Sequence, residues 1–133
     1  MCSRHLSNNN YDKFERTFPK LRDRQLVMNV MRTVLEHYDD PKMTLERIAE
    51  EELLSKSHLS HIFKQVTGML FSDYVRNIRI NAACRLLRDT DMTNEQICYA
   101  CGFTDVPSFY RFFQTHMNMT LSTYRKSINN NAY

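Results

Sequence analysis

The apolar residues of this chain recur at helical spacing, in runs separated by short polar stretches. Between Leu21 and Tyr38 they follow the three- and four-residue intervals that gather side chains on one face of a helix. The apolar positions of this first helix are Leu26, Val27, Val30, Met31, Val34 and Leu35. Asp39–Pro41 ends it, because proline cannot donate a backbone hydrogen bond and restricts the residue before it. A longer amphipathic helix is predicted over Phe71–Asp89. Its apolar row at i,i+4 spacing consists of Tyr74, Ile78, Ala82 and Leu86.

Residues that cap helices predict where the shorter helices begin and end. Thr44 can cap one helix, and Ser55 can cap the next, which runs to about Val66 and ends before Gly68. Thr93–Gln96 has the pattern of a capping box. The remaining candidate caps are Thr104 or Asp105, and Thr120.

A pattern of about 30 residues occurs twice in the chain, first over Leu45–Arg76 and again over Asn94–Arg125. The matched pairs are Ile48 and Ile97, Ala49 and Cys98, Leu54 and Phe103, Leu59 and Phe109, Phe63 and Phe113, and Tyr74 and Tyr124. Each copy predicts a short helix, a tight turn, a longer helix and the start of another helix. Two helix-turn-helix units at a fixed spacing favour a protein that binds periodic duplex over a catalyst.

Composition supports a helical fold. Only two glycines and three prolines occur, which leaves little turn chemistry for a many-stranded sheet. We therefore predict an all-α fold of two helix-turn-helix subdomains, here called lobes, joined by a long linker helix. The expected division is a disordered leader or linker over 1–20, a first lobe over 21–70, the linker helix over 71–90, a second lobe over 91–127 and a flexible tail over 128–133. A helix of about 19 residues rises roughly 28 Å, which approaches the spacing of about 34 Å between major-groove faces on one side of B-DNA.

The charge and cysteine content narrow the class of protein. A net charge of +3 permits nucleic-acid binding. No apolar run reaches the length of a membrane span and the N-terminus has no apolar signal region, so we expect a cytoplasmic protein. Cys98 and Cys101 form half of a zinc site, but no second pair of ligands exists, so we predict no metal and expect both to fill the core. Cys84 has polar neighbours and is expected to be an exposed thiol.

The predicted helix after Ser55 has an apolar face and a polar face. Leu59, Ile62 and Phe63 belong to the buried stripe. The opposite face carries Lys56, Ser57, Ser60, His61 and Lys64. No carboxylate lies between Lys56 and Thr67, whereas the preceding helix is acidic, so the charges are segregated. Such side chains can contact phosphates and base edges, although an ordinary solvated helix face has the same composition.

The matching helix of the second copy offers fewer polar groups. Val106 and Pro107 occupy its first turn, and Arg111 with Gln114 supplies the hydrogen-bonding capacity. Arg111 can form a bidentate contact with guanine or bind a phosphate, and Val106 can contact a thymine methyl group. The alternative is a surface arginine without a role in binding. Neither copy contains a nucleophile elbow, a phosphate-binding loop or a pair of catalytic carboxylates, so we expect no enzyme activity.

These residues resemble the DNA-binding domain of the AraC/XylS family of bacterial transcription regulators, over about Leu26–Ser127. The linker helix resembles the family at Arg79, Ile80, Ala83 and the run Leu86–Thr90. The second unit resembles it most specifically. Its matching positions are Ile97, Gly102, Phe103, Thr104, Asp105, Phe109, Arg111, Phe113, Ser122, Tyr124 and Arg125.

The resemblance implies seven helices, with the third and sixth entering successive major-groove segments of double-stranded DNA. It places base contacts on Ser57, Ser60, His61, Val106, Pro107 and Arg111. Phosphate contacts are expected at Thr44, Lys56, Lys64, Thr93 and Gln114. No cofactor is implied, and RNA polymerase is the implied protein partner. We expect the domain itself to be monomeric and a longer protein to dimerise through a separate domain.

Several positions depart from the family pattern. Leu53 stands where the first turn has a glycine, and Asn118 replaces a glycine in the second unit. Glycine tolerates positive φ and leucine does not, so the first turn is expected to be strained or reshaped. The apolar Val106 and Pro107 favour recognition of DNA shape or backbone by the second lobe.

Two other classes remain open. A DNA-repair methyl acceptor of related fold needs a cysteine cluster before the helices, where only Cys2 occurs. A protein-interaction module whose second lobe no longer binds DNA would also fit the Val106 and Pro107 surface.

Overall fold

The structure is a computed structural model that describes residues 20–131, and within that range the chain is entirely helical apart from its turns. The helices are α2 (Leu21–His37), α3 (Leu45–Glu51), α4 (Lys56–Thr67), α5 (Phe71–Asp89), α6 (Asn94–Ala100), α7 (Val106–Met117) and α8 (Leu121–Asn131). The predicted all-α fold with about seven helices is confirmed. The leader expected over 1–20 lies almost wholly outside the described residues. Within them, no helix combines the length and the apolar character needed to cross a membrane.

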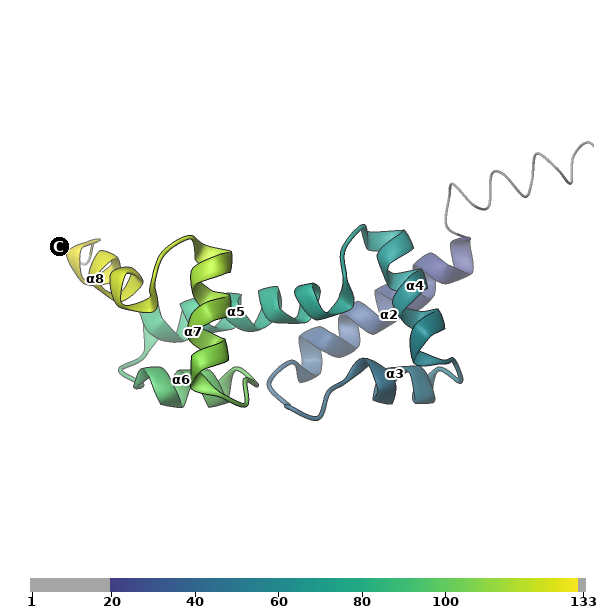
Figure 1. Cartoon of the computed structure of the whole chain (residues 1–133), viewed down its shortest axis with the longest axis horizontal. Helices are drawn as coiled ribbons and strands as arrows, with labels where there is room; N and C mark the ends of the chain where they lie inside the picture. The colour runs from purple at the N-terminus through teal and green to yellow at the C-terminus, as the bar shows by residue number, and fades with distance from the viewer. Residues whose placement is uncertain (1–19, 132–133) are drawn as a thin grey trace, which may run out of the picture.

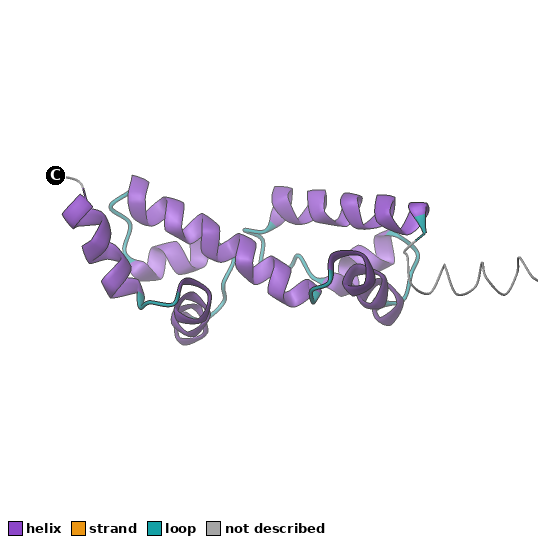
Figure 2. Ribbon diagram, turned by 90° about the horizontal axis from the view of Figure 1, so that it is seen from above, coloured by secondary structure: helices purple, strands orange, loops and turns teal. Residues whose placement is uncertain are grey.

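The long helix α5 runs through the middle of the molecule and joins its two ends (Figure 1). The first lobe, α2 to α4, lies at one end, and the second lobe, α6 to α8, lies at the other. In Figure 1, α4 and α7 run roughly parallel, with α7 in front of α5 and α4 in front of α2. Seen from above, α7 lies beside α5 and α4 lies beyond one end of it (Figure 2). The longer helices of the two helix-turn-helix units therefore lie toward the same face of the molecule.

Side-chain caps begin the shorter helices where the sequence predicts them. Oxygens of Thr44, Ser55 and Asp105 accept the backbone N–H three residues later, at 3.3, 3.1 and 2.9 Å. Thr93 forms the expected capping box. Of the two candidates before α7, Asp105 is the cap and Thr104 is not. Each cap satisfies a backbone donor that the first helical turn leaves unpaired.

The last helix is longer than expected. Thr120 caps it as predicted, accepting from the Thr123 N–H at 3.1 Å. The helix then continues to Asn131, although a flexible tail was expected from residue 128. The reason is Ile128, which is partly buried against the second core and extends the apolar row of Leu121 and Tyr124 by a further turn.

Each lobe has its own hydrophobic core, as predicted. The first core contains Val27, Val30, Val34, Met43, Leu45, Ile48, Ala49, Leu59, Ile62, Phe63, Phe71 and Val75. The second contains Ile80, Ala82, Ala83, Cys84, Leu87, Ile97, Cys98, Cys101, Phe103, Phe109, Phe113 and Leu121. Leu35 was wrongly assigned to the buried face of α2. It is 55% exposed, because α2 packs on one side only, and Leu21 and Met28 are exposed on it as well.

The cysteine assignments are confirmed for two residues and wrong for a third. Cys98 and Cys101 are fully buried in the second core. Burial raises the pKa of Cys101 to about 12, so its thiol stays protonated. Cys84 is also buried, because it lies on the side of α5 that faces the second lobe, with its Sγ 3.7 Å from Met117 Sδ. Across residues 20–131, no cluster of His, Cys, Asp and Glu has the ligand number of a metal site.

The turn between α3 and α4 contains a strained residue. Leu53 has a φ of +58° and is 92% exposed. A left-handed backbone costs a residue with a Cβ free energy that packing does not recover here. Asn118, which ends α7, has the same φ, but asparagine tolerates this region better.

Truncating either central phenylalanine should destabilise the domain. We expect Phe63→Ala and Phe113→Ala each to lower the free energy of unfolding by about 3–5 kcal/mol, because both rings are fully buried. Urea unfolding followed by circular dichroism measures the change. The control is Tyr99→Ala, whose ring is 49% exposed, with an expected change below about 1 kcal/mol. Equal effects of the control and the core substitutions would contradict the assignment of the cores.

Removing the strain at Leu53 should stabilise the domain. We expect Leu53→Gly to raise the free energy of unfolding by about 1 kcal/mol, since glycine adopts positive φ without the Cβ clash. Leu53→Ala keeps the Cβ and should gain little, and Asn118→Gly should gain less than Leu53→Gly. An unchanged or lower stability of Leu53→Gly in the same urea titration would refute this account of the turn.

Candidate nucleic-acid interface

The outer face of α4 carries the polar residues that the sequence assigned to it. Ser57, His61 and Lys64 are exposed, and Ser60 is half-buried. These four side chains line one surface depression together with Gln65. Leu59, Ile62 and Phe63 fill the first core from the opposite face of the helix. Hydrogen-bonding groups and positive charge are thus presented to solvent on a rigidly packed helix.

The outer face of α7 is more apolar. Pro107 is exposed and Val106 half-exposed in the first turn, and Arg111 and Gln114 are exposed further along. The Arg111 guanidinium donates to Ser108 Oγ at 3.2 Å and lies 5.5 Å from the centre of the Phe112 ring. These neighbours orient Arg111 on the surface, while its remaining donors stay available to a ligand.

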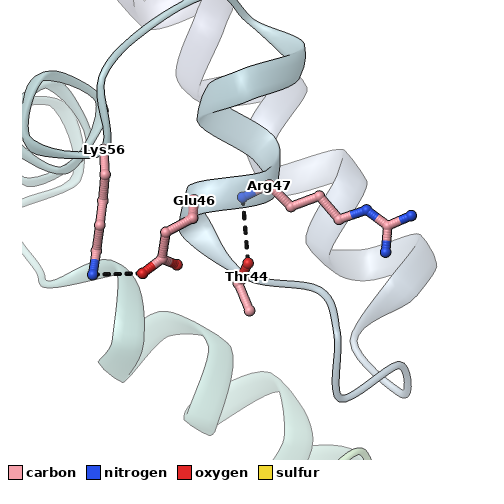
Figure 3. A network of polar contacts seen from close by, with 4 residues as sticks. All are labelled: Thr44, Glu46, Arg47 and Lys56. Atoms are coloured by element: carbon pink, nitrogen blue, oxygen red, sulfur yellow. Dashed lines mark hydrogen bonds and ion pairs between the residues drawn. The ribbon is translucent and has the colours of Figure 1, made fainter.

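The expected segregation of charge around α4 does not hold in space. Lys56 Nζ lies 2.7 Å from Glu46 Oε1, in the first turn of α3 (Figure 3). The hydrogen bond from Lys56 lowers the pKa of Glu46, so the carboxylate is ionised at neutral pH. Thr44 lies beside this pair, where its side chain caps α3 through the Arg47 N–H. Glu46 therefore competes with any phosphate for Lys56.

The start of α6 near Thr93 is held by long-range contacts. Arg125, on α8, donates to Asn94 Oδ1 and to the Met92 carbonyl, both at 2.7 Å. Asn94 in turn donates to the Tyr110 hydroxyl of α7 at 3.5 Å. These bonds hold the first turn of α6 against α7 and α8.

Arg76 is a residue that sequence reasoning did not assign to the interface. It extends from α5 between the two longer helices, forms an ion pair with Asp73, and lies 4.4 Å from the centre of the Phe112 ring. It borders one depression together with Ser60 and another together with Arg111. The repeat contains a signal for it, because Tyr74 matches Tyr124 and Arg76 therefore matches another basic residue, Lys126.

Comparison with known proteins identifies the family. A family profile described as a helix-turn-helix domain matches residues 48–127. The chain is 34% identical to the probable transcription factor PqrA of Proteus vulgaris, over 62% of this chain and 68% of that protein. It is 28% identical to the uncharacterised HTH-type transcriptional regulator YijO of Escherichia coli, over 77% of this chain but only 36% of YijO. The chain thus spans about a third of the length of YijO.

A solved structure shares the fold. This is a transcriptional regulator from Chromobacterium violaceum described by its AraC-type DNA-binding domain, with a TM-score of 0.70 and 25% identity. The match covers 82% of this chain and 96% of that one. With the two helix-turn-helix units in place, the chain belongs to the AraC/XylS family of transcription regulators, as a DNA-binding domain of that family.

Proposed function

We propose that the domain binds a specific sequence of double-stranded DNA by inserting α4 and α7 into two adjacent segments of the major groove. The observation that carries this proposal is that both helices run roughly parallel toward the same face of the molecule, with exposed residues on their outer faces. The rise of α5 over its 19 residues is roughly 28 Å. Major-groove faces on one side of B-DNA recur about every 34 Å, so modest bending or tilting aligns both helices with the duplex.

The two helices contribute differently to base recognition. Ser57, Ser60 and His61 give α4 both donors and acceptors for base edges. Among the three residues of α7 that we propose to contact bases, Arg111 is the only charged one, and its guanidinium can donate two hydrogen bonds to guanine. Val106 and Pro107 offer only apolar contact. The first lobe accordingly supplies more of the discrimination between sequences.

Phosphate contacts position the domain on the duplex. Lys64 is exposed at the edge of the α4 surface and is the simplest phosphate ligand, with Gln114 in the corresponding place on α7. Lys56 adds a further phosphate contact when its ion pair with Glu46 breaks. Thr44 and Thr93 cap α3 and α6, and the first turns of these helices would face the phosphate backbone of the DNA.

Regulation of transcription follows from this binding. The domain would recruit RNA polymerase at a promoter, act in the bacterial cytoplasm where the chromosome lies, and stay monomeric unless another domain dimerises it. A thiol-transfer function finds no support at Cys84, Cys98 and Cys101, whose side chains are buried. The protein-interaction alternative draws on the apolar Val106 and Pro107, and salt-dependent binding to random duplex separates the two functions.

Selection from a random DNA pool tests which side chains contact bases. We expect the wild-type domain to select two half-sites about one helical turn apart. Arg111→Ala should cost about 1–3 kcal/mol on the selected site and relax preference at one base pair, because a bidentate guanine contact is lost. His61→Ala should relax preference in the other half-site. Arg32→Ala, at an exposed position on α2, is the control. If both substitutions leave the selected sequence unchanged, recognition by two helices is wrong.

The salt dependence of binding tests the phosphate contacts. Lys64→Ala should weaken binding about equally on all sequences and reduce the magnitude of the slope of log affinity against log salt by about one. Glu46→Gln should do the opposite, strengthening binding and steepening the slope, because it frees Lys56 from its ion pair. Fluorescence anisotropy at several salt concentrations measures both. Slopes identical to that of the wild type would show that neither lysine contacts a phosphate.

A further inference from the structure

The two lobes touch each other directly, in addition to being joined by α5. The loop that follows α2 in the first lobe reaches the turn that follows α6 in the second. Tyr38, at the start of that loop, packs partly buried against both hydrophobic cores. The relative position of the lobes is therefore set at two places, along α5 and at this contact.

Arg79 closes the contact from α5. Its Nε donates to the Tyr38 carbonyl at 2.8 Å, and its Nη2 donates to the Asp40 carbonyl at 3.3 Å. The partners lie 41 and 39 residues away in sequence, so these bonds connect parts of the fold that no local element joins. Burial lowers the pKa of Arg79, and nearby Asp40 opposes that effect. A guanidinium is held in such a place only where its donors are satisfied.

Gly102 provides the space for the contact from the second lobe. An added Cβ would lie 2.3 Å from the Tyr38 carbonyl oxygen and 2.9 Å from Arg79 Nε. The backbone of the first lobe thus occupies the position that any other side chain would need. The φ of Gly102 is +94°, which also disfavours a residue with a Cβ. We call Arg79, Gly102 and the carbonyls of Tyr38 and Asp40 the interlobe clasp.

A neighbouring contact holds α7 itself to α5. The Arg76 guanidinium packs on the Phe112 ring at 4.4 Å and is paired with Asp73 on its own helix. Arg76, Arg79 and Phe112 also line the same depression between the lobes. The orientation of α7 is consequently coupled to the helix that carries the clasp.

We propose that the interlobe clasp makes the domain selective for the number of base pairs between its two half-sites, with Arg79 as the positioning residue. The proposal rests on the proposed function. Inserting one base pair moves the second half-site by about 3.4 Å along the duplex and turns it by roughly 35°. With the clasp closed, α4 and α7 keep one separation and one relative angle, and they cannot follow this change. With the clasp open, only α5 and the packing of the Tyr38 side chain connect the lobes, and the second lobe can adjust.

Binding to sites of altered spacing tests the proposal. The probes are the selected duplex and two derivatives with one base pair inserted or deleted between the half-sites. We expect wild-type protein to bind either derivative at least about tenfold more weakly than the parent site. In Arg79→Ala that penalty should fall below about threefold, and Gly102→Ala, which opens the clasp from the other lobe, should behave alike. Arg79→Lys keeps one donor and should restore part of the penalty.

The matched control is Arg85→Ala. Arg85 is exposed on the same helix and takes part in no hydrogen bond or ion pair that the structure places within residues 20–131. It should keep the wild-type penalty. A merely destabilising role for Arg79 would weaken binding to all three duplexes equally, leaving the ratio unchanged. That result would overturn the proposal.

A measurement without DNA separates failure of this proposal from failure of the proposed function. Residual dipolar couplings of the free protein should fit one alignment tensor for both lobes in the wild type and two different tensors in Arg79→Ala. Binding of no duplex by the wild type would refute the proposed function, and the clasp with it as a determinant of spacing. Specific wild-type binding together with a single tensor and a full spacing penalty in Arg79→Ala would refute the clasp alone. If Arg79→Ala does not fold, Arg79→Lys and Gly102→Ala are judged by the same two measurements.

Discussion

Helix α5 buries Phe71 and Val75 in the first core and, little more than a turn later, Ile80, Ala83 and Leu87 in the second. A helix advances about 100° per residue, so the rotation between these two buried faces is fixed by backbone geometry. The lobes cannot turn far around α5 without exposing one of the faces to water, and the interlobe clasp fixes the smaller changes of angle that bending of α5 would allow. The directions of α4 and α7 follow from this constraint, because each packs on its own lobe's core and is carried wherever α5 places it.

The surface around α4 and α7 is only moderately cationic. The net charge of the chain is +3, and Glu46 forms an ion pair with Lys56, the first residue of α4. Counterion release by a few phosphate contacts supplies limited affinity on any sequence. Under the proposed function, the domain would therefore gain much of its affinity from base contacts, and its weak binding to other sequences would let it dissociate from incorrect sites quickly. Under the proposed function, the ion pair at Lys56 would favour discrimination between sequences over high affinity for any sequence.

Much of the fold could be predicted because its causes are local. The capping box at Thr93, the bounds of α5 and the burial of Phe63 and Phe113 all follow from residues within a few turns of each other. The placement of candidate interface residues on the outer faces of α4 and α7 follows from the same periodicity.

What could not be predicted depends on contacts between distant residues. Cys84 has polar neighbours in sequence, but its side of α5 is covered by the second lobe. Glu46 belongs to an acidic helix that the turn at Leu53 folds back onto Lys56. The hydrogen bonds of Arg79 join residues about forty positions apart in sequence. No spacing of residue types predicts a contact with a backbone carbonyl.

The contact at Gly102 has a consequence for protein engineering. Because the domain consists of two similar helix-turn-helix units, one unit could be exchanged for that of another regulator to obtain a chimera that recognises a new DNA sequence. Here the halves are not independent cassettes, because the first must present its Tyr38 carbonyl to a position without a side chain in the second. A chimera that joins halves along α5 alone would inherit both recognition surfaces and lose the alignment between them. Crossover points must therefore keep the loop after α2, Arg79 and Gly102 from a single parent.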